Sequence, residues 1–172
     1  VIARSATITP LLHGGNQQRA RSGTQDAAGA VAFGVAAAAV GRTVAVDAAR
    51  GDLAARRDRL IAGVRRAVPT AVLRGDPLDR LPGNAHFTFP GCEGDSLLFL
   101  LDAAGFSVST GSACQAGVPE ASHVLLAMGL SEADARGALR MTIGDDTTEA
   151  EIDALVAALP DAVSRAQAAG LS

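Results

Sequence analysis

Hydrophobic and polar positions follow two different periods along the chain. Residues 47–68 place apolar side chains on one helical stripe with arginines largely off it, which predicts an amphipathic helix. Residues 85–89 and 139–143 alternate with a period of two and predict strands. The alanine-rich residues 25–40 predict a buried helix, because alanine has the highest helix propensity. The apolar residues 94–104 predict a second buried helix.

Turn and cap residues mark where several elements begin or end. Gly105 suits the C-terminal cap of the helix at 94–104, since glycine adopts the left-handed conformation easily. Two pairs have the spacing of a capping box, in which a hydroxyl and a carboxylate satisfy the first helical turn: Ser131 with Asp134, and Thr148 with Glu151. The remaining predicted elements are strands at 71–74 and 106–110, a helix from Pro119 to about Met128, and a terminal helix or helix pair at 149–169, interrupted at Pro160.

The order of these elements predicts an α/β (α+β) sandwich of roughly one domain with a short sheet. A length of 172 residues suffices for one domain and a piece of a second. The chain begins Val1-Ile2-Ala3-Arg4, which resembles the end of a strand, so we expect a fragment of a longer protein. The pattern alone indicates no more than a globular α/β domain.

Composition narrows the possible partners. Aromatic residues make up 3% of the chain and the net charge is −3, so nucleic acid is not an expected partner. No apolar run is long enough to span a bilayer, so no membrane partner is expected either. The two cysteines, Cys92 and Cys114, form no metal or redox motif, and we expect a cytoplasmic protein with no metal site. All 15 basic residues are arginines, so the chain has no lysine.

Cys114 lies among small residues. Every residue within three positions of it is small except Gln115. A lone free cysteine is commonly a small buried hydrophobic residue, and that interpretation stays open. The surrounding glycine, serine and alanine residues instead favour a loop that can bring a thiol to a bound ligand. Cys114 is therefore a candidate nucleophile, since the thiolate is the reactive form of cysteine.

Arg140 is a charged residue inside an apolar strand, between Leu139 and Met141. The period of two places it on the opposite face of the strand from those neighbours. It either faces solvent on a half-exposed strand or provides a guanidinium fork for a carboxylate. Residues 13–24 offer glycine N–H groups, arginines and hydroxyls before a helix, a weak anion-binding signal. The remaining candidates are interpreted as structural: His13, His86, His123 and Cys92.

Five stretches, taken in order, resemble the NifS/IscS-type cysteine desulfurases of the class V aminotransferase group. They are H-G-G-N-Q-Q-R-A-R-S-G-T at 13–24, G-N-A-H-F-T-F at 83–89, E-G-D-S-L at 93–97, S-T-G-S-A-C at 109–114, and A-L-R-M-T-I-G at 138–144, followed by T-T-E-A-E-I-D at 147–153. The resemblance extends over nearly the whole chain. The ordered set is far more specific than any one stretch.

This resemblance implies an enzyme that uses pyridoxal 5′-phosphate to remove sulfur from L-cysteine, giving L-alanine and an enzyme-bound persulfide. Cys114 is implied to be the catalytic thiol and Arg140 to bind the α-carboxylate of the substrate. Thr24 is implied to bind the cofactor phosphate in the partner subunit of a homodimer. The sulfur is implied to pass to an iron–sulfur scaffold or another acceptor protein, with Cys114 as the residue that meets an iron–sulfur cluster during transfer.

The same resemblance implies a domain division. Residues 1–24 are expected to end the large cofactor-binding domain, and residues 25–172 to form the connecting helix and C-terminal small domain of a fold-type I enzyme. The family's cofactor-binding lysine lies upstream, and this chain has no lysine, so we expect the isolated chain to be inactive. Two alternatives stay open: a non-catalytic domain of a split or truncated enzyme, and a related selenocysteine lyase or class V aminotransferase.

Overall fold

The computed structural model describes residues 9–10, 12–14, 21–50, 52–111 and 121–170. The chain divides into two compact units, Val1–Val46 and Asp47–Ser172. These limits come from contacts within the chain and do not test the domain boundary predicted after residue 24, which stays a prediction.

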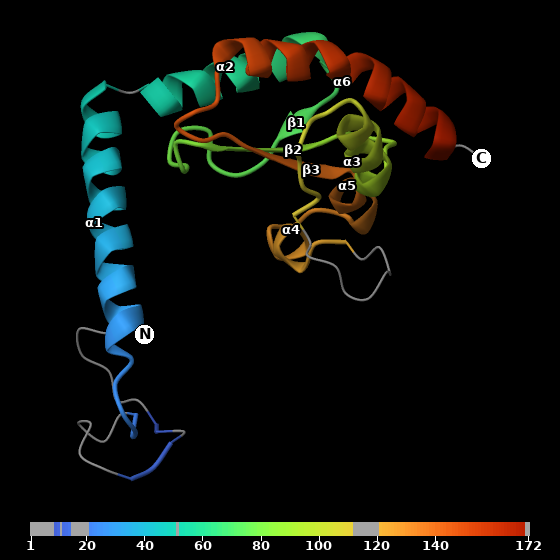
Figure 1. Ribbon diagram of the computed structural model, residues 1–172. Coiled ribbons are helices and arrows are strands. Elements are labelled where there is room, and N and C mark those ends of the chain that lie inside the picture. The colour runs from blue at the N-terminus through green and yellow to red at the C-terminus, as the bar shows by residue number, and fades with distance from the viewer. Residues whose placement is uncertain (1–8, 11, 15–20, 51, 112–120, 171–172) are drawn as a thin grey trace. The chain divides into compact units, whose positions relative to one another are not determined.

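The first unit contains most of α1 (Ala27–Arg50) (Figure 1). Asp26 caps this helix, because its Oδ1 accepts a 2.8 Å hydrogen bond from the N–H of Gly29. The helix predicted at 25–40 is confirmed and continues further than predicted. The apolar side chains at 27–42 are exposed rather than buried, as Phe33 at 61% illustrates. The described part of this unit contains no second helix or strand that could cover them.

The second unit contains a small sheet with helices on both faces. Its elements in chain order are α2 (Asp52–Ala67), β1 (Val72–Leu73), β2 (Asn84–Thr88), α3 (Gly94–Ala103), α4 (His123–Ala127), α5 (Glu132–Arg136), β3 (Ala138–Thr142) and α6 (Glu149–Gly170). β2 is the central strand and pairs antiparallel with β1 and with β3. This arrangement confirms the predicted α/β class with a short sheet.

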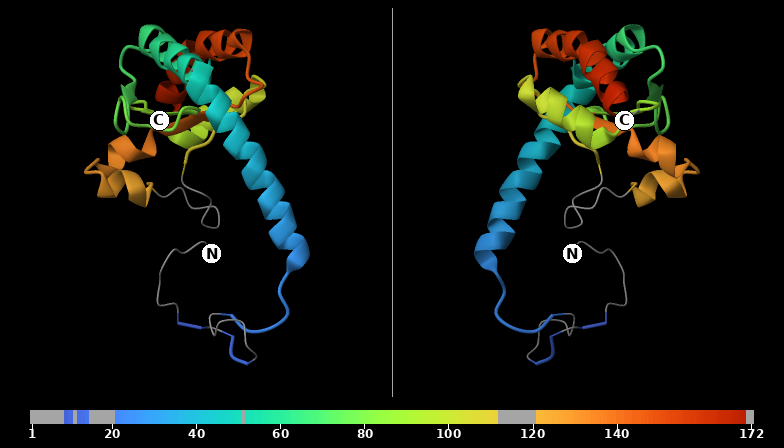
Figure 2. Two further views of the ribbon diagram at one scale, coloured as in Figure 1. Left: turned by 90° about the vertical axis from the view of Figure 1, so that its left-hand side faces the viewer. Right: turned by 90° about the vertical axis from the view of Figure 1, so that its right-hand side faces the viewer.

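The helices divide between the two faces of the sheet. α2 packs along α6, and α3 packs on α6 and β3, over one face (Figures 1 and 2). α4 and α5 contact each other on the opposite face. There Leu125 and Ala135 pack against Ala138, the first residue of β3, in a separate small cluster. The larger core therefore lies on one side of the sheet only.

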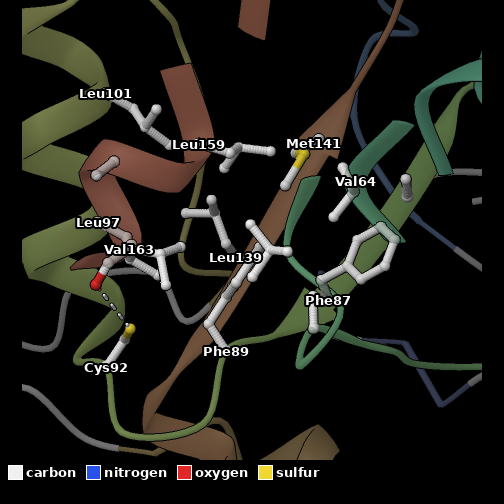
Figure 3. Close-up of a cluster of buried hydrophobic side chains, with 14 of the residues drawn as sticks. Val64, Phe87, Phe89, Cys92, Leu97, Leu101, Leu139, Met141, Leu159 and Val163 are labelled. Atoms are coloured by element: carbon white, nitrogen blue, oxygen red, sulfur yellow. Dashed lines mark hydrogen bonds between the residues drawn. The ribbon is translucent and has the colours of Figure 1, made fainter. Parts of the chain in front are cut away.

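Alternate residues of β2 and β3 point into that core (Figure 3). They are Ala85, Phe87, Leu139 and Met141, each no more than 2% exposed. The helices contribute Val64 from α2, Leu97 and Leu101 from α3, and Leu159 and Val163 from α6. Burial of apolar area stabilises the fold by roughly 25 cal/mol per Å². Since every second side chain of β2 and β3 is buried, the period of two in the sequence corresponds to a sheet with one buried and one polar face.

Cys92 belongs to this core. The residue is 4% exposed, and its Sγ lies 3.8 Å from the carbonyl oxygen of Val163 (Figure 3). Burial raises the pKa of the Cys92 thiol, because a low-polarity environment disfavours the thiolate. The interpretation of Cys92 as a structural residue agrees with this placement.

α3 ends as its sequence predicts. The N–H of Gly105 donates to the carbonyl of Asp102 and that of Phe106 to the carbonyl of Leu101, both at 2.9 Å. These two bonds form a Schellman motif, which requires a left-handed residue. Gly105 supplies it with a φ of +90°. The cap reverses the chain direction, and Ser109 then lies beside β3.

Both predicted pairs cap their helices, and the pair at Thr148 forms the complete capping box. The N–H of Asp134 donates to Ser131 Oγ at 3.1 Å at the start of α5. At the start of α6, the N–H of Glu151 donates to Thr148 Oγ1 at 3.2 Å, and the N–H of Thr148 donates back to Glu151 Oε2 at 2.7 Å. These reciprocal bonds satisfy N–H groups that a helix leaves free at its first turn.

Three local predictions are wrong. Residues 106–110 form no strand, since only Ser109 makes a single bridge, to Arg140. α6 continues through Pro160 as one helix. The helix predicted from Pro119 begins, within the described residues, at His123, and Pro119 itself lies outside them.

Arg57 also departs from the predicted pattern. It was expected on the polar side of the amphipathic helix, yet it is only 7% exposed. Its Nη1 donates to the carbonyl of Leu81 at 3.3 Å, and its Nη2 lies 2.8 Å from the carboxylate of Asp58. A buried guanidinium is tolerated because its donors find acceptors.

Candidate functional site

The second face of the sheet exposes Arg140. Its neighbours on β3, Leu139 and Met141, are buried in the core, while Arg140 itself is exposed. The period of two therefore gave the correct face for this side chain.

The backbone of Arg140 is fixed from the side of Ser109. The N–H of Ser109 donates to the carbonyl of Arg140 at 3.0 Å, and the N–H of Arg140 donates to the carbonyl of Ser109 at 2.6 Å. The Arg140 Nη2 lies 3.4 Å from Ser109 Oγ, a long and therefore weak hydrogen bond. Among the described residues this is the one acceptor of the Arg140 side chain, so most of its five donors are available to a ligand.

His86 on β2 lies directly opposite Arg140 in the strand register. Since the N–H and C=O of Arg140 both point to Ser109, His86 and Arg140 form a non-hydrogen-bonded pair. Such pairs bring facing side chains closest together, with Cα atoms roughly 4.5 Å apart. The two side chains share the polar face, because residues opposite each other in a sheet point the same way.

The Nε2 atom of His86 is buried and has no hydrogen-bond partner among the described residues, and the same holds for Asn84 Oδ1 on the same strand. The ring edge of His86 lies close to Gly111, where an added Cβ would meet Cε1 and Nε2 at 3.8 Å. Burial, followed by the positive charges of Arg140, Arg74 and Arg80, lowers the pKa of His86 below its usual value. The imidazole is therefore neutral at neutral pH.

Two further arginines lie on this face. The N–H of Arg74, directly after β1, donates to the carbonyl of His86 at 2.8 Å, and its Nε donates to Thr88 Oγ1 at 2.8 Å. The Nη2 of Arg80 donates to the Arg74 carbonyl at 2.8 Å. No ion pair between described residues involves Arg74, Arg80 or Arg140. This polar face carries excess positive charge and can bind an anion.

Thr24 lies in the first unit and is exposed. The hydroxyl of nearby Ser22 is already used, since it donates to the carbonyl of Gly14. The following helix start is occupied by the carboxylate of Asp26. The signal for an anion at this helix start is thereby weakened, and Thr24 as a phosphate ligand stays a prediction.

Cys114 lies in residues 112–120, outside the described residues. Gly111 immediately before this segment has a φ of +82°, a conformation that favours glycine. The assignment of Cys114 as a nucleophile therefore stays a prediction from the sequence.

Metal and membrane sites find no support in the described part of the chain. It contains no group of three or more His, Cys, Asp or Glu side chains able to hold a metal ion. Within the same residues, every helix is too short or too polar to cross a bilayer.

The sequence and the fold together identify the family. Residues 7–155 match the model of the aminotransferase class-V family. The chain therefore belongs to the aminotransferase class-V family, as its sequence motifs indicated.

Among curated proteins, relatives are named cysteine desulfurases. An IscS-like cysteine desulfurase of Mycobacterium tuberculosis is 50% identical over 100% of this chain and 44% of the relative. The cysteine desulfurase IscS of Methanosarcina thermophila is 39% identical, and NifS of Azotobacter vinelandii is 38% identical, each over 95% of this chain and 40% of the relative. The chain thus spans less than half the length of these relatives.

Solved structures agree with the fold. A NifS-like protein from Rickettsia africae matches 92% of this chain and 41% of its own, with a TM-score of 0.74 and 26% identity. A second NifS-like protein matches 95% of this chain and 41% of its own, with a TM-score of 0.71 and 30% identity. The α/β fragment is therefore of the NifS-like type.

The family implies dependence on pyridoxal 5′-phosphate. The residues of this chain could provide part of a site for this cofactor and its amino-acid substrate. Arg140, which forms no ion pair within the described residues, suits the carboxylate of an amino acid that reaches the cofactor. No residue can bind the cofactor aldehyde as a lysine does, since the 172 residues contain no lysine. The covalent attachment must come from another segment or chain.

The sequence pattern did not predict that His86 lies beside Arg140. The period of two placed it on the same face as Arg140, yet nothing local linked the two strands. A signal was present, because His86 and Arg140 both interrupt apolar strands with charge-bearing side chains. Their pairing depends on the register of β2 with β3, which the sequence pattern does not give.

Proposed function

We propose that this chain serves in a cysteine desulfurase of the length of its relatives. That enzyme would remove sulfur from L-cysteine with pyridoxal 5′-phosphate as cofactor. The observation that carries the proposal is 50% identity over the entire chain to a relative named IscS-like cysteine desulfurase. The exposed guanidinium of Arg140 supports it, since among the described residues it forms no ion pair and is available to a substrate carboxylate.

Arg140 binds the α-carboxylate of the substrate in this proposal. Its backbone is held by Ser109 and by the β2–β3 ladder, so the guanidinium projects from a rigid strand. Bidentate contact with a carboxylate fixes both the position and the orientation of the bound amino acid. A fixed orientation is needed for the substrate sulfur to meet a nucleophile.

Cys114 is the sulfur acceptor. Its thiolate attacks the sulfur of the bound cysteine, an S–S bond forms, and the C–S bond breaks with its electron pair moving to the substrate carbon. Bound pyridoxal phosphate supplies the electron sink that makes the substrate carbons reactive. After protonation of that carbon the products are L-alanine and a persulfide on Cys114, so atoms and electrons balance.

The remaining assignments complete the proposal. Thr24 binds the cofactor phosphate in the partner subunit of a homodimer, and the protein works in the cytoplasm. An acceptor protein, such as an iron–sulfur scaffold, takes the persulfide sulfur. An acceptor is required chemically, because the Cys114 thiol must be regenerated for a second turnover.

The test uses the full-length protein loaded with cofactor. We expect Cys114→Ala to abolish alanine and persulfide formation from L-cysteine while the cofactor absorbance is retained. Cys92→Ala is the matched control, because Cys92 lies in the core, and it should retain turnover. Full alanine release by Cys114→Ala would remove Cys114 from the mechanism. No alanine release by the wild-type enzyme would overturn the desulfurase itself.

A second candidate function is a non-catalytic part of a split enzyme. The absence of lysine favours it for the polypeptide alone. Mixing this chain with a separately expressed N-terminal part of a relative and measuring cofactor absorbance and alanine release distinguishes the two. Restored activity supports the desulfurase, and cofactor binding without turnover supports the non-catalytic role.

A further inference from the structure

His86 presents an unused polar atom next to Arg140. Its Nε2 is buried and lacks a partner among the described residues. A buried donor or acceptor without a hydrogen bond destabilises a fold, so native proteins keep few of them. A purely structural histidine would direct this nitrogen to solvent or to a backbone carbonyl.

The charges around His86 favour an anion as the partner. Arg140, Arg74 and Arg80 are the charged groups that influence it, and all three are positive. None of them forms an ion pair in the described part of the chain, although Asp76 and Asp58 also interact with Arg80 at longer range. An imidazolium would add a fourth positive charge to this face. A neutral imidazole that donates one N–H to an anion fits the same surroundings without that repulsion.

We propose that His86 is a second substrate-binding residue beside Arg140, whose neutral imidazole donates its Nε2–H to the α-carboxylate of the amino-acid substrate. The proposal rests on the function proposed above, and it adds a residue to the same site. A carboxylate has two oxygens with about four acceptor positions. Arg140 and His86 can therefore bind the same carboxylate.

The strand register supports a shared ligand. As a non-hydrogen-bonded pair, His86 and Arg140 have the closest facing side chains that an antiparallel sheet allows. The ring edge with Nε2 lies against the turn at Gly111. A carboxylate that binds Nε2 in this arrangement would also lie within reach of the Arg140 guanidinium.

Three substitutions of His86 distinguish the role of its Nε2–H donor from the role of its aromatic ring. Gln places an amide N–H near the position of Nε2, Asn places it near Nδ1, and Phe keeps a ring without a donor. In the cofactor-loaded full-length enzyme we expect His86→Phe and His86→Asn to raise the KM for L-cysteine by about 10- to 100-fold with little change in kcat. His86→Gln should restore most of the affinity. His123→Phe, on the exposed start of α4, is the control and should leave KM unchanged.

A second measurement needs no turnover. In the 172-residue chain, nitrogen NMR of the three histidines reports which ring nitrogen carries the proton. We expect His86 Nε2 to be protonated and to respond to acetate, against a chloride control of equal ionic strength. His13 and His123, both exposed, should show no specific response. An Nε2 without a proton, or without a response to acetate, overturns the proposal.

Together, the kinetic and NMR experiments show whether the desulfurase function or the carboxylate-binding role of His86 is wrong. If wild-type enzyme releases no alanine from L-cysteine, the desulfurase proposal fails, while the acetate response still decides whether Nε2 meets a carboxylate. If the wild type is active and His86→Phe keeps the wild-type KM, the desulfurase stands and the role of His86 is refuted.

Discussion

Ser109 and Arg140 exchange both of their backbone hydrogen bonds, at 3.0 and 2.6 Å. On its other side Arg140 pairs with His86 in the β2–β3 register. Ser109 thus holds the backbone of Arg140 directly on one side, and its neighbours Leu139 and Met141 pair with β2 on the other. The backbone that carries this guanidinium is already ordered before a ligand binds, which reduces the entropy lost on binding.

Arg140→Ala tests the carboxylate role in the full-length, cofactor-loaded enzyme. We expect the KM for L-cysteine to rise by about 10- to 100-fold, since a hydrogen bond to a charged group contributes roughly 1.5–3 kcal/mol. Arg140→Lys should recover only part of the loss, because an ammonium cannot form the bidentate fork. Steady-state kinetics provide the measurement.

Arg136→Ala is the matched control for this prediction. Arg136 is an exposed arginine four residues away, paired with Glu132 on α5 at 2.8 Å. Its loss should leave KM unchanged. If both variants raise KM equally, the increase comes from a general electrostatic effect and the specific contact between Arg140 and the carboxylate is refuted.

Leu139→Ala tests the two-faced character of β3. Leu139 has 0% exposure, and deletion of a buried leucine side chain typically costs about 2–5 kcal/mol. Arg140→Ala at the next position should change the free energy of unfolding by less than about 1 kcal/mol, as exposed substitutions do. Urea denaturation of the 172-residue chain measures both values. Equal losses at 139 and 140 would contradict the assignment of faces.

Glu151 makes the start of α6 sensitive to acid. Hydrogen bonds from the N–H and then the hydroxyl of Thr148 hold the pKa of Glu151 below its usual range. A lowered carboxyl pKa stabilises the fold at pH values above the unfolded pKa of about 4.3. That contribution is lost as the pH falls through the folded pKa.

The corresponding experiment compares wild type with Glu151→Gln between pH 7 and pH 3. We expect the variant to be less stable at pH 7 and the difference to shrink on acidification. Urea midpoints at each pH provide the measurement. Thr148→Ala should cost about 0.5–2 kcal/mol as a lost helix cap. A stability difference that does not change with pH would show that Glu151 acts through something other than its charge.

Cys92 provides a probe of the core. Because it is buried and the pKa of its thiol is raised, we expect iodoacetamide to modify it only when the structure opens. The measurement uses Cys114→Ala, in which Cys92 is the remaining thiol. Labelling should be slow in buffer and fast in urea. Rapid labelling in buffer would show that the contact between α6 and the Cys92 turn opens readily.

Local chemistry accounts for most of what the sequence predicted correctly. Gly105, the Ser131 helix cap and the face of Arg140 each depend on residues within a few positions. Such features are set by backbone conformation and short-range hydrogen bonds, which the sequence displays directly.

Features that depend on distant partners were missed. Arg57 is buried because a carbonyl at Leu81 accepts from it. Pro160 is accommodated within α6, whose helix packs on α2 and α3. His86 gains its significance from a strand register that no local pattern reveals. In each case tertiary contacts override the local propensity.

The outer strands of the small sheet also limit aggregation. Free N–H and C=O groups on an edge strand recruit strands from other copies, and short, charged or covered edges prevent this. β1 has only two residues and is followed directly by Arg74, while Ser109 occupies the outer backbone groups of β3 at Arg140. The contact that holds the backbone of Arg140 therefore also occupies part of the edge at which a second copy could extend the sheet.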